Sequence, residues 1–255
     1  MLVAAAVCPC PPLLVPELAA GAAPELDTAR AACTDALGVL AAARPDRLVV
    51  VGPADESGHG AYAQGAAGSF RGFGVDVDVR LGRAAADRAD QADQAEGRAD
   101  QAALPEPSRG PLPTSLAVAA WLLERTEWAD APIEGLAVEP LTVERCIEIG
   151  RDIAARAERV ALLVMGDASA CRTLKAPGYL DERAEPFDAS VARALGKADT
   201  EALKTLDIQL AHDLKASGRA PWQILAGAAE QAGLSGALLY DDAPYGVGYL
   251  VATWS

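Results

Sequence analysis

The sequence predicts a single α/β domain, spanning residues 1–255, in which helices cover both faces of a central mixed β-sheet. Three observations predict this fold. Short apolar runs alternate along the chain with segments of helical periodicity, the apolar share of 51% is enough for a large core, and polar loops follow several apolar runs. Because aromatic residues make up only 5%, alanine, valine and leucine must fill most of that core.

Strands are expected where apolar runs lack helical periodicity. The runs at 2–7, 47–51 and 159–165 do not alternate with polar residues, which is typical of strands buried on both faces. The segment 75–79 alternates valine with aspartate, as a strand with one wet face does. Further strands are predicted at 133–138, 237–240 and 247–253.

Helices are expected where apolar residues recur every three or four positions. A helix over 24–43 places four apolar side chains on one face, and Thr142 is the predicted N-cap of a helix that starts at Val143. Further helices are predicted at 115–128, 187–195 and 222–232. One continuous helix is expected to carry Leu203, Leu206, Leu210 and Leu214.

The composition excludes several classes of function. A formal net charge of −14 opposes non-specific binding to nucleic acid or to an anionic membrane. Residues 84–107 are rich in alanine and aspartate, and we expect a solvated insertion there, either disordered or a frayed helix. No apolar run is long enough to span a membrane and no signal peptide is predicted, so a cytoplasmic location with five reduced cysteines is expected.

Three polar loops, at 8–12, 52–60 and 166–172, follow predicted strands. Ligands of open α/β sheets bind at the carboxyl ends of strands, so a small-molecule site is expected at these loops. Cys8 and Cys10 are separated by one residue in an extended segment, so both thiols can face one pocket and bind a soft metal. Alternatively, they are two small buried residues at the end of a strand. Nearby cations can bind a carboxylate or phosphate group or lie on the surface: Arg172, Lys175 and Arg219.

These loops resemble those of the B-subunit-type class III extradiol ring-cleavage dioxygenases and the related MEMO-like proteins. In that superfamily two histidines and one glutamate or cysteine bind the metal. The matching positions are Cys10 in Cys8-Pro9-Cys10-Pro11-Pro12, Asp55 in Gly52-Pro53-Ala54-Asp55, and Ser217 before Gly218-Arg219-Ala220-Pro221. The acid–base histidine of the family corresponds to Ala170 in Gly166-Asp167-Ala168-Ser169-Ala170.

The resemblance implies Fe(II), O₂ and a catechol-type substrate. A facial triad binds Fe(II) with two imidazoles and one carboxylate, whereas Cys10, Asp55 and Ser217 offer a thiol, a carboxylate and a hydroxyl. We therefore expect altered or lost Fe(II) chemistry, with another divalent or soft metal, or no metal, as alternatives. Two hypotheses follow: an enzyme related to the ring-cleavage dioxygenases that acts on a catechol-type or other small molecule, and a non-catalytic MEMO-like binding or interaction protein.

The candidates for catalytic roles are Asp167, Ser169 and His59. Asp167 and Ser169 follow a predicted buried strand and either contact a ligand or cap the next segment. His59 lies in a glycine-rich loop, where it either supplies an imidazole to the site or is a mobile loop residue. His212 is expected on the polar side of its helix, at the surface. The family resemblance also implies a homo-oligomer.

Overall fold

The computed structural model describes residues 1–55, 58–82, 110–128 and 131–255, and the predicted insertion at 84–107 lies outside them. Seven strands in these residues form one mixed sheet in the order β3-β6-β2-β7-β1-β9-β8. Its centre is parallel and consists of β1 (Leu2–Cys8), β2 (Arg47–Pro53), β6 (Ile133–Val138) and β7 (Val160–Met165). The antiparallel partners are β3 (Gly60–Tyr62), β8 (Gly236–Asp242) and β9 (Tyr249–Trp254).

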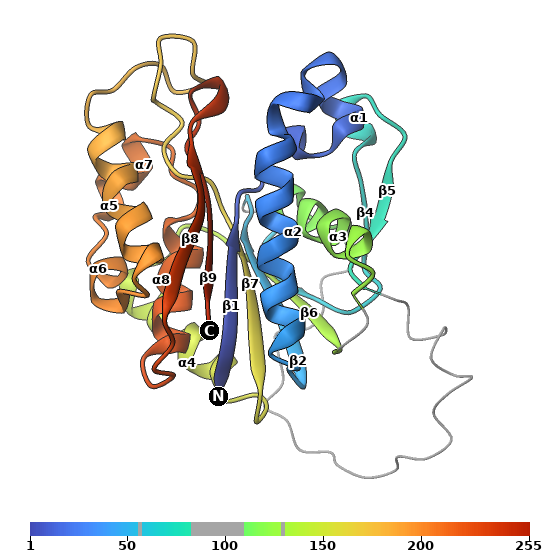
Figure 1. The fold of residues 1–255 in the computed structure, drawn as a ribbon, viewed down its shortest axis with the longest axis vertical. Helices are drawn as coiled ribbons and strands as arrows, with labels where there is room; N and C mark the ends of the chain where they lie inside the picture. Colours follow the sequence, from blue (N-terminus) through green and yellow to red (C-terminus); the bar gives the residue numbers. More distant parts are fainter. Residues whose placement is uncertain (56–57, 83–109, 129–130) are drawn as a thin grey trace.

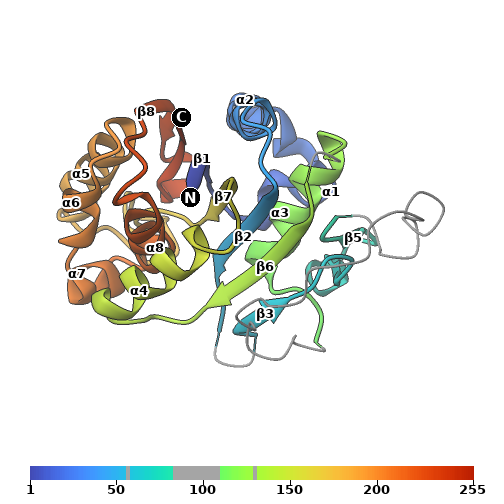
Figure 2. The same cartoon turned by 90° about the horizontal axis from the view of Figure 1, so that it is seen from below.

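Helices cover both faces of this sheet, which confirms the predicted α/β architecture (Figure 1). One face carries α2 (Asp27–Ala42) and α3 (Thr114–Arg125), and α1 (Pro16–Ala19) lies beside them. The other face carries α4 (Val143–Ala154), α5 (Ala184–Gly196), α6 (Thr200–Lys204), α7 (Ile208–Asp213) and α8 (Arg219–Ala229). Viewed from below, the two helical groups lie on opposite sides of the strands (Figure 2).

Successive side chains of the buried strands point to opposite faces of the sheet, so the core is divided between these two faces. In β1, Ala4 and Ala6 pack with the cluster around α2 and α3, while Ala5 and Val7 pack with the cluster around α4, α5 and α8. The helices α4 and α8 approach closely, since a Cβ atom added at Gly150 would collide with the backbone of α8. The alanine- and glycine-rich composition therefore supports close packing of the layers.

Several predicted boundaries differ from the structure. The helix expected from residue 24 starts at Asp27, because Pro24 lies inside a 3-10 segment, Ala20–Leu26. The last strand starts at Tyr249 instead of 247, because the preceding segment Pro244–Gly246 turns through positive φ angles. The strand expected at 75–79 is reduced to β5 (Asp78–Arg80), which pairs with β4 (Ala67–Ser69) in a second sheet.

The prediction of one continuous leucine-lined helix is wrong. Its residues form α6 and α7, because two aspartates start separate helices. The Asp199 side chain accepts a hydrogen bond from the N–H of Ala202, and the Asp207 side chain accepts one from the N–H of Leu210. By contrast, the predicted N-cap is confirmed, since the Thr142 hydroxyl accepts a hydrogen bond from the N–H of Arg145 at the start of α4.

Two expectations from the composition can be compared with the structure. All five cysteines are free thiols, as predicted, and the structure adds that all five are buried. None of the helices in the described residues has both the length and the apolar character needed to cross a bilayer. The remaining short elements are the 3-10 turns Pro12–Leu14, Arg71–Phe73 and Pro244–Gly246.

Candidate functional site

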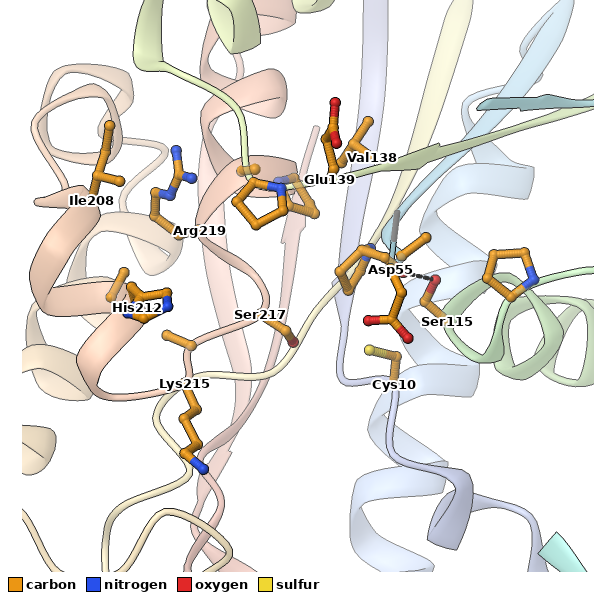
Figure 3. Close-up of a pocket in the computed structure, with 18 of the residues that line it drawn as sticks. Cys10, Asp55, Ser115, Val138, Glu139, Ile208, His212, Lys215, Ser217 and Arg219 are labelled. Carbon is orange, nitrogen blue, oxygen red and sulfur yellow. Dashed lines mark hydrogen bonds between the residues drawn. The ribbon is translucent and has the colours of Figure 1, made fainter. Parts of the chain in front are cut away.

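A cavity of about 1310 Å³ opens at the carboxyl ends of the parallel strands. One wall comes from the segments that follow β1, β2 and β6 and from the start of α3, and the facing wall comes from α7, the loop after it and the start of α8 (Figure 3). Parallel strands end at one edge of the sheet, so their polar loop residues converge there. The lining residues are Cys10, Pro53, Ala54, Asp55, Pro113, Thr114, Ser115, Val138, Glu139, Pro140, Ile208, Gln209, Ala211, His212, Lys215, Ala216, Ser217, Arg219, Ala220 and Pro221.

The three positions that the sequence analysis aligned with metal ligands all line this cavity. Cys10 follows β1 and is 7% exposed, while Asp55 follows β2 and is exposed. Ser217 lies on the facing wall, in the loop between α7 and α8, and is exposed (Figure 3). The structure therefore brings together side chains from three loops that are far apart in the sequence.

Asp167 links the two walls behind these residues, although it does not itself line the cavity. Its carboxylate accepts a hydrogen bond from the N–H of Cys10 at 2.8 Å, and its other oxygen lies 3.9 Å from the Cys10 sulfur. Its own N–H donates to the Ser217 hydroxyl at 3.0 Å. Asp167 thus contacts two of the three aligned positions and holds them next to each other.

Burial sets the protonation of this cluster. It raises the pKa of Asp167 to about 6, although hydrogen bonds from Cys10 oppose the shift. Burial, and secondly the charge of Asp167, raise the pKa of the Cys10 thiol well above its ordinary value. At neutral pH the Cys10 thiol therefore keeps its proton and can donate it to an ionised Asp167 carboxylate.

Ser169 lies in a separate buried cluster and does not line the cavity. Its N–H and its hydroxyl donate to the two carboxylate oxygens of Asp188 on α5, at 2.8 and 2.7 Å. Arg172 forms an ion pair with the same carboxylate at 3.1 Å. Sequence reasoning missed Asp188, although an acid on the apolar face that contains Val191 and Leu195 was an available signal.

The remaining residues singled out in the sequence differ in whether they line the cavity. His59 is exposed and does not line the cavity. His212 is exposed, as predicted, but it also lines the cavity. Ala170 makes backbone hydrogen bonds with Leu214 and Gly178, and Lys175 does not line the cavity.

Cys8 and Cys10 do not face one pocket, contrary to the first of the two readings of this pair. Cys8 is fully buried and does not line the cavity. Its pKa is raised, chiefly by a hydrogen bond with Cys33 on α2 and then by burial. Since β1 ends at Cys8, the sheet does not impose the alternation of an extended strand on Cys10.

The side chains at the aligned positions do not fit the Fe(II) site that the family resemblance implies. That site has two imidazoles and one carboxylate, whereas the aligned positions supply the thiol of Cys10, the carboxylate of Asp55 and the hydroxyl of Ser217. The Ser217 hydroxyl is a neutral donor, which leaves Asp55 as the one anionic group in the set. Within the described residues, no group of three or more histidine, cysteine, aspartate and glutamate side chains has an arrangement that could hold a metal ion.

Comparisons with known proteins support the fold. The chain matches no protein family and no curated protein. It is similar to a crystal structure of the uncharacterized protein JW3007 from Escherichia coli K12, with a TM-score of 0.52 and 14% sequence identity. The similarity covers 99% of this chain and 100% of that chain, so the two folds correspond over their whole length.

Proposed function

We propose that this chain is an extradiol dioxygenase-like protein that binds a catechol-type or similar small molecule and has lost the family's Fe(II) chemistry. One observation carries the proposal: Cys10, Asp55 and Ser217, aligned one by one with the family's ligand positions, line a single cavity. That cavity lies at the carboxyl ends of the parallel strands, where α/β folds bind their ligands. Its volume of about 1310 Å³ is sufficient for a small molecule with associated water.

The side chains favour binding over oxygen activation. Fe(II) oxygenases of this type bind the metal with two imidazoles and one carboxylate and keep open positions, whereas here one ligand position is a thiol and another is a neutral hydroxyl. A catechol does not need a metal to bind, since its hydroxyl groups can donate to carboxylate oxygens such as those of Asp55. The apolar residues of the cavity, among them Val138, Pro140 and Ile208, can contact the ring.

The test combines binding, metal content and oxygen consumption. Protein purified without oxygen is analysed for iron and titrated with catechol by calorimetry, and O₂ uptake is then followed in air. We expect catechol binding without stoichiometric iron and without catechol-dependent O₂ uptake. Ser217→Trp, which fills the cavity, is expected to abolish binding, while Asp35→Trp on the exposed side of α2 retains it. Stoichiometric iron with catechol-dependent O₂ uptake would contradict the loss of Fe(II) chemistry.

A second variant tests the alignment of the ligand positions. Changing Cys10→His and Ser217→Glu together supplies an imidazole and a second carboxylate beside Asp55. We expect Fe(II) affinity to rise relative to the unmodified chain, measured by titration without oxygen. The pair His59→Ala and His212→Ala is the matched control for the contribution of the native histidines. An Fe(II) affinity unchanged by the two ligand substitutions would show that the aligned positions do not share one site.

A further inference from the structure

Arg219 is a buried cation that lines the cavity at the start of α8. It is 4% exposed. Its Nη1 donates to the carbonyl oxygen of Leu141 at 2.6 Å and to Oε1 of Gln223 at 2.9 Å. Both acceptors are neutral, and in the part of the chain that the structure describes Arg219 forms no ion pair.

Its neighbours hold the guanidinium in place without neutralising it. The Gln223 amide is fixed, because its Nε2 lies 3.3 Å from the carbonyl oxygens of both Lys204 and Leu206 and donates to them. This leaves Oε1 of Gln223 as the acceptor that orients Arg219. The side chain is therefore positioned by two hydrogen bonds, while its positive charge is left uncompensated by a carboxylate among the described residues.

An uncompensated charge at this position is costly. A buried charge is ordinarily paired, because removing an ion from water is unfavourable. Arg219 is also the first residue of an 11-residue helix, where the helix dipole adds further positive potential. Burial accordingly lowers the pKa of Arg219. A bound negative group would offset both costs.

The charged groups of the cavity are divided between its two walls. The wall made by α7, α8 and the loop between them carries the cations Arg219 and Lys215, together with the imidazole of His212 (Figure 3). The acids Asp55 and Glu139 come from the segments after β2 and β6, on the facing wall. A ligand with one anionic group would therefore be oriented by this wall, with its neutral part toward Cys10 and Asp55.

We propose that Arg219, at the start of α8, binds an anionic group of the cavity's ligand, such as a carboxylate or phosphate. The planar guanidinium suits a group with two oxygens, to which it can donate two parallel hydrogen bonds. This inference rests on the proposed function in that it places the anion on the small molecule bound in the cavity.

The experiment compares ligands that differ in charge. Catechol, 3,4-dihydroxybenzoate and inorganic phosphate are titrated separately into the full-length protein by calorimetry at neutral pH. We expect 3,4-dihydroxybenzoate to bind roughly ten- to a hundredfold more tightly than catechol, as for a charged hydrogen-bonded pair. Arg219→Gln should remove this preference, so that 3,4-dihydroxybenzoate and catechol bind with similar affinity. Arg145→Gln, which removes an exposed cation from α4, is the matched control and should keep the preference.

The outcomes separate this inference from the proposed function. If catechol binds and the carboxylate adds nothing, or if Arg219→Gln keeps the preference, the anion site is wrong while the proposed function stands. If phosphate alone binds and Arg219→Gln abolishes that binding, the anion site stands and the catechol-type ligand is wrong. If none of the three ligands binds, both are overturned. Should Arg219→Gln fail to fold, Gln223→Glu provides the test, because it places a carboxylate beside the guanidinium, and a preference that it leaves undiminished counts against the proposal.

Discussion

Asp167 and Asp188 both fix the loop at 166–172, but their partners differ in charge. Asp188 is 1% exposed, accepts two hydrogen bonds from Ser169 and forms an ion pair with Arg172. The Asp167 carboxylate accepts from Cys10, and no cation contributes to the shift of its pKa. A buried acid paired with a cation is typical of a structural role, whereas an acid beside a cavity whose carboxylate accepts hydrogen bonds but has no cation partner is typical of a functional site.

The largest expected change in the free energy of unfolding comes from Asp188→Ala. This change leaves Arg172 and the Ser169 hydroxyl without their carboxylate, and breaking a buried pair costs roughly 3–5 kcal/mol. We expect the free energy of unfolding, measured by urea denaturation, to fall by about this amount. Asp213→Ala, which removes a partner of exposed Arg183, is the control and should cost at most about 1 kcal/mol. Equal losses in the two variants would show that the Asp188 cluster is not structural.

Asp167→Asn should raise the free energy of unfolding, by a smaller amount than Asp188→Ala lowers it. The pKa of Asp167 is raised from its ordinary 3.8 to about 6 in the folded chain, so the folded state binds more protons than the unfolded state between these values. Wild-type stability therefore loses a contribution as pH rises from about 4 to 6. Asparagine keeps the shape and cannot ionise, so Asp167→Asn should exceed wild type by roughly 1–3 kcal/mol at pH 7.

The pH dependence distinguishes this explanation from a change in packing. The difference between Asp167→Asn and wild type should shrink as pH falls and disappear below about pH 3, where the Asp167 carboxyl is protonated in both folded and unfolded states. Urea denaturation at pH 3, 4, 5, 6 and 7 measures it. A stability difference that does not vary with pH would remove ionisation as the cause, and a less stable variant at pH 7 would mean that the carboxylate stabilises the fold as Asp188 does.

The smallest expected effect concerns the reactivity of Cys10. The charge of Asp167 helps to raise the Cys10 pKa, and the thiolate is the reactive form. Asp167→Asn should therefore accelerate alkylation of Cys10 by iodoacetamide at pH 8, by about twofold to tenfold, as measured by mass spectrometry of the labelled peptide. Cys146, which lies on α4, is the internal control and should not change. Slower labelling of Cys10 in the variant would mean that Asp167 assists removal of the thiol proton.

The loop at 166–172 shows what the pattern of apolar and polar residues in the sequence can predict about the site. The buried run that became β7 and the polar residues after it predicted that Asp167 and Ser169 lie at the edge of the sheet. The pattern does not indicate that Asp167 contacts the cavity residues Cys10 and Ser217, whereas Ser169 contacts Asp188. That depends on Cys10 and Asp188, which are 157 and 19 residues away from their respective partners.

The sequence by itself determined the α/β fold, the buried strands and the loops at which the cavity lies, because the periodicity of apolar residues encodes which faces are buried. Tertiary structure decided which residues of those loops act together. It turned Cys8 toward Cys33 and left Cys10 at the cavity, and it placed Arg219 in the wall without an acidic partner among the described residues. The physical reason is that protonation and charge compensation depend on neighbours that only folding brings together.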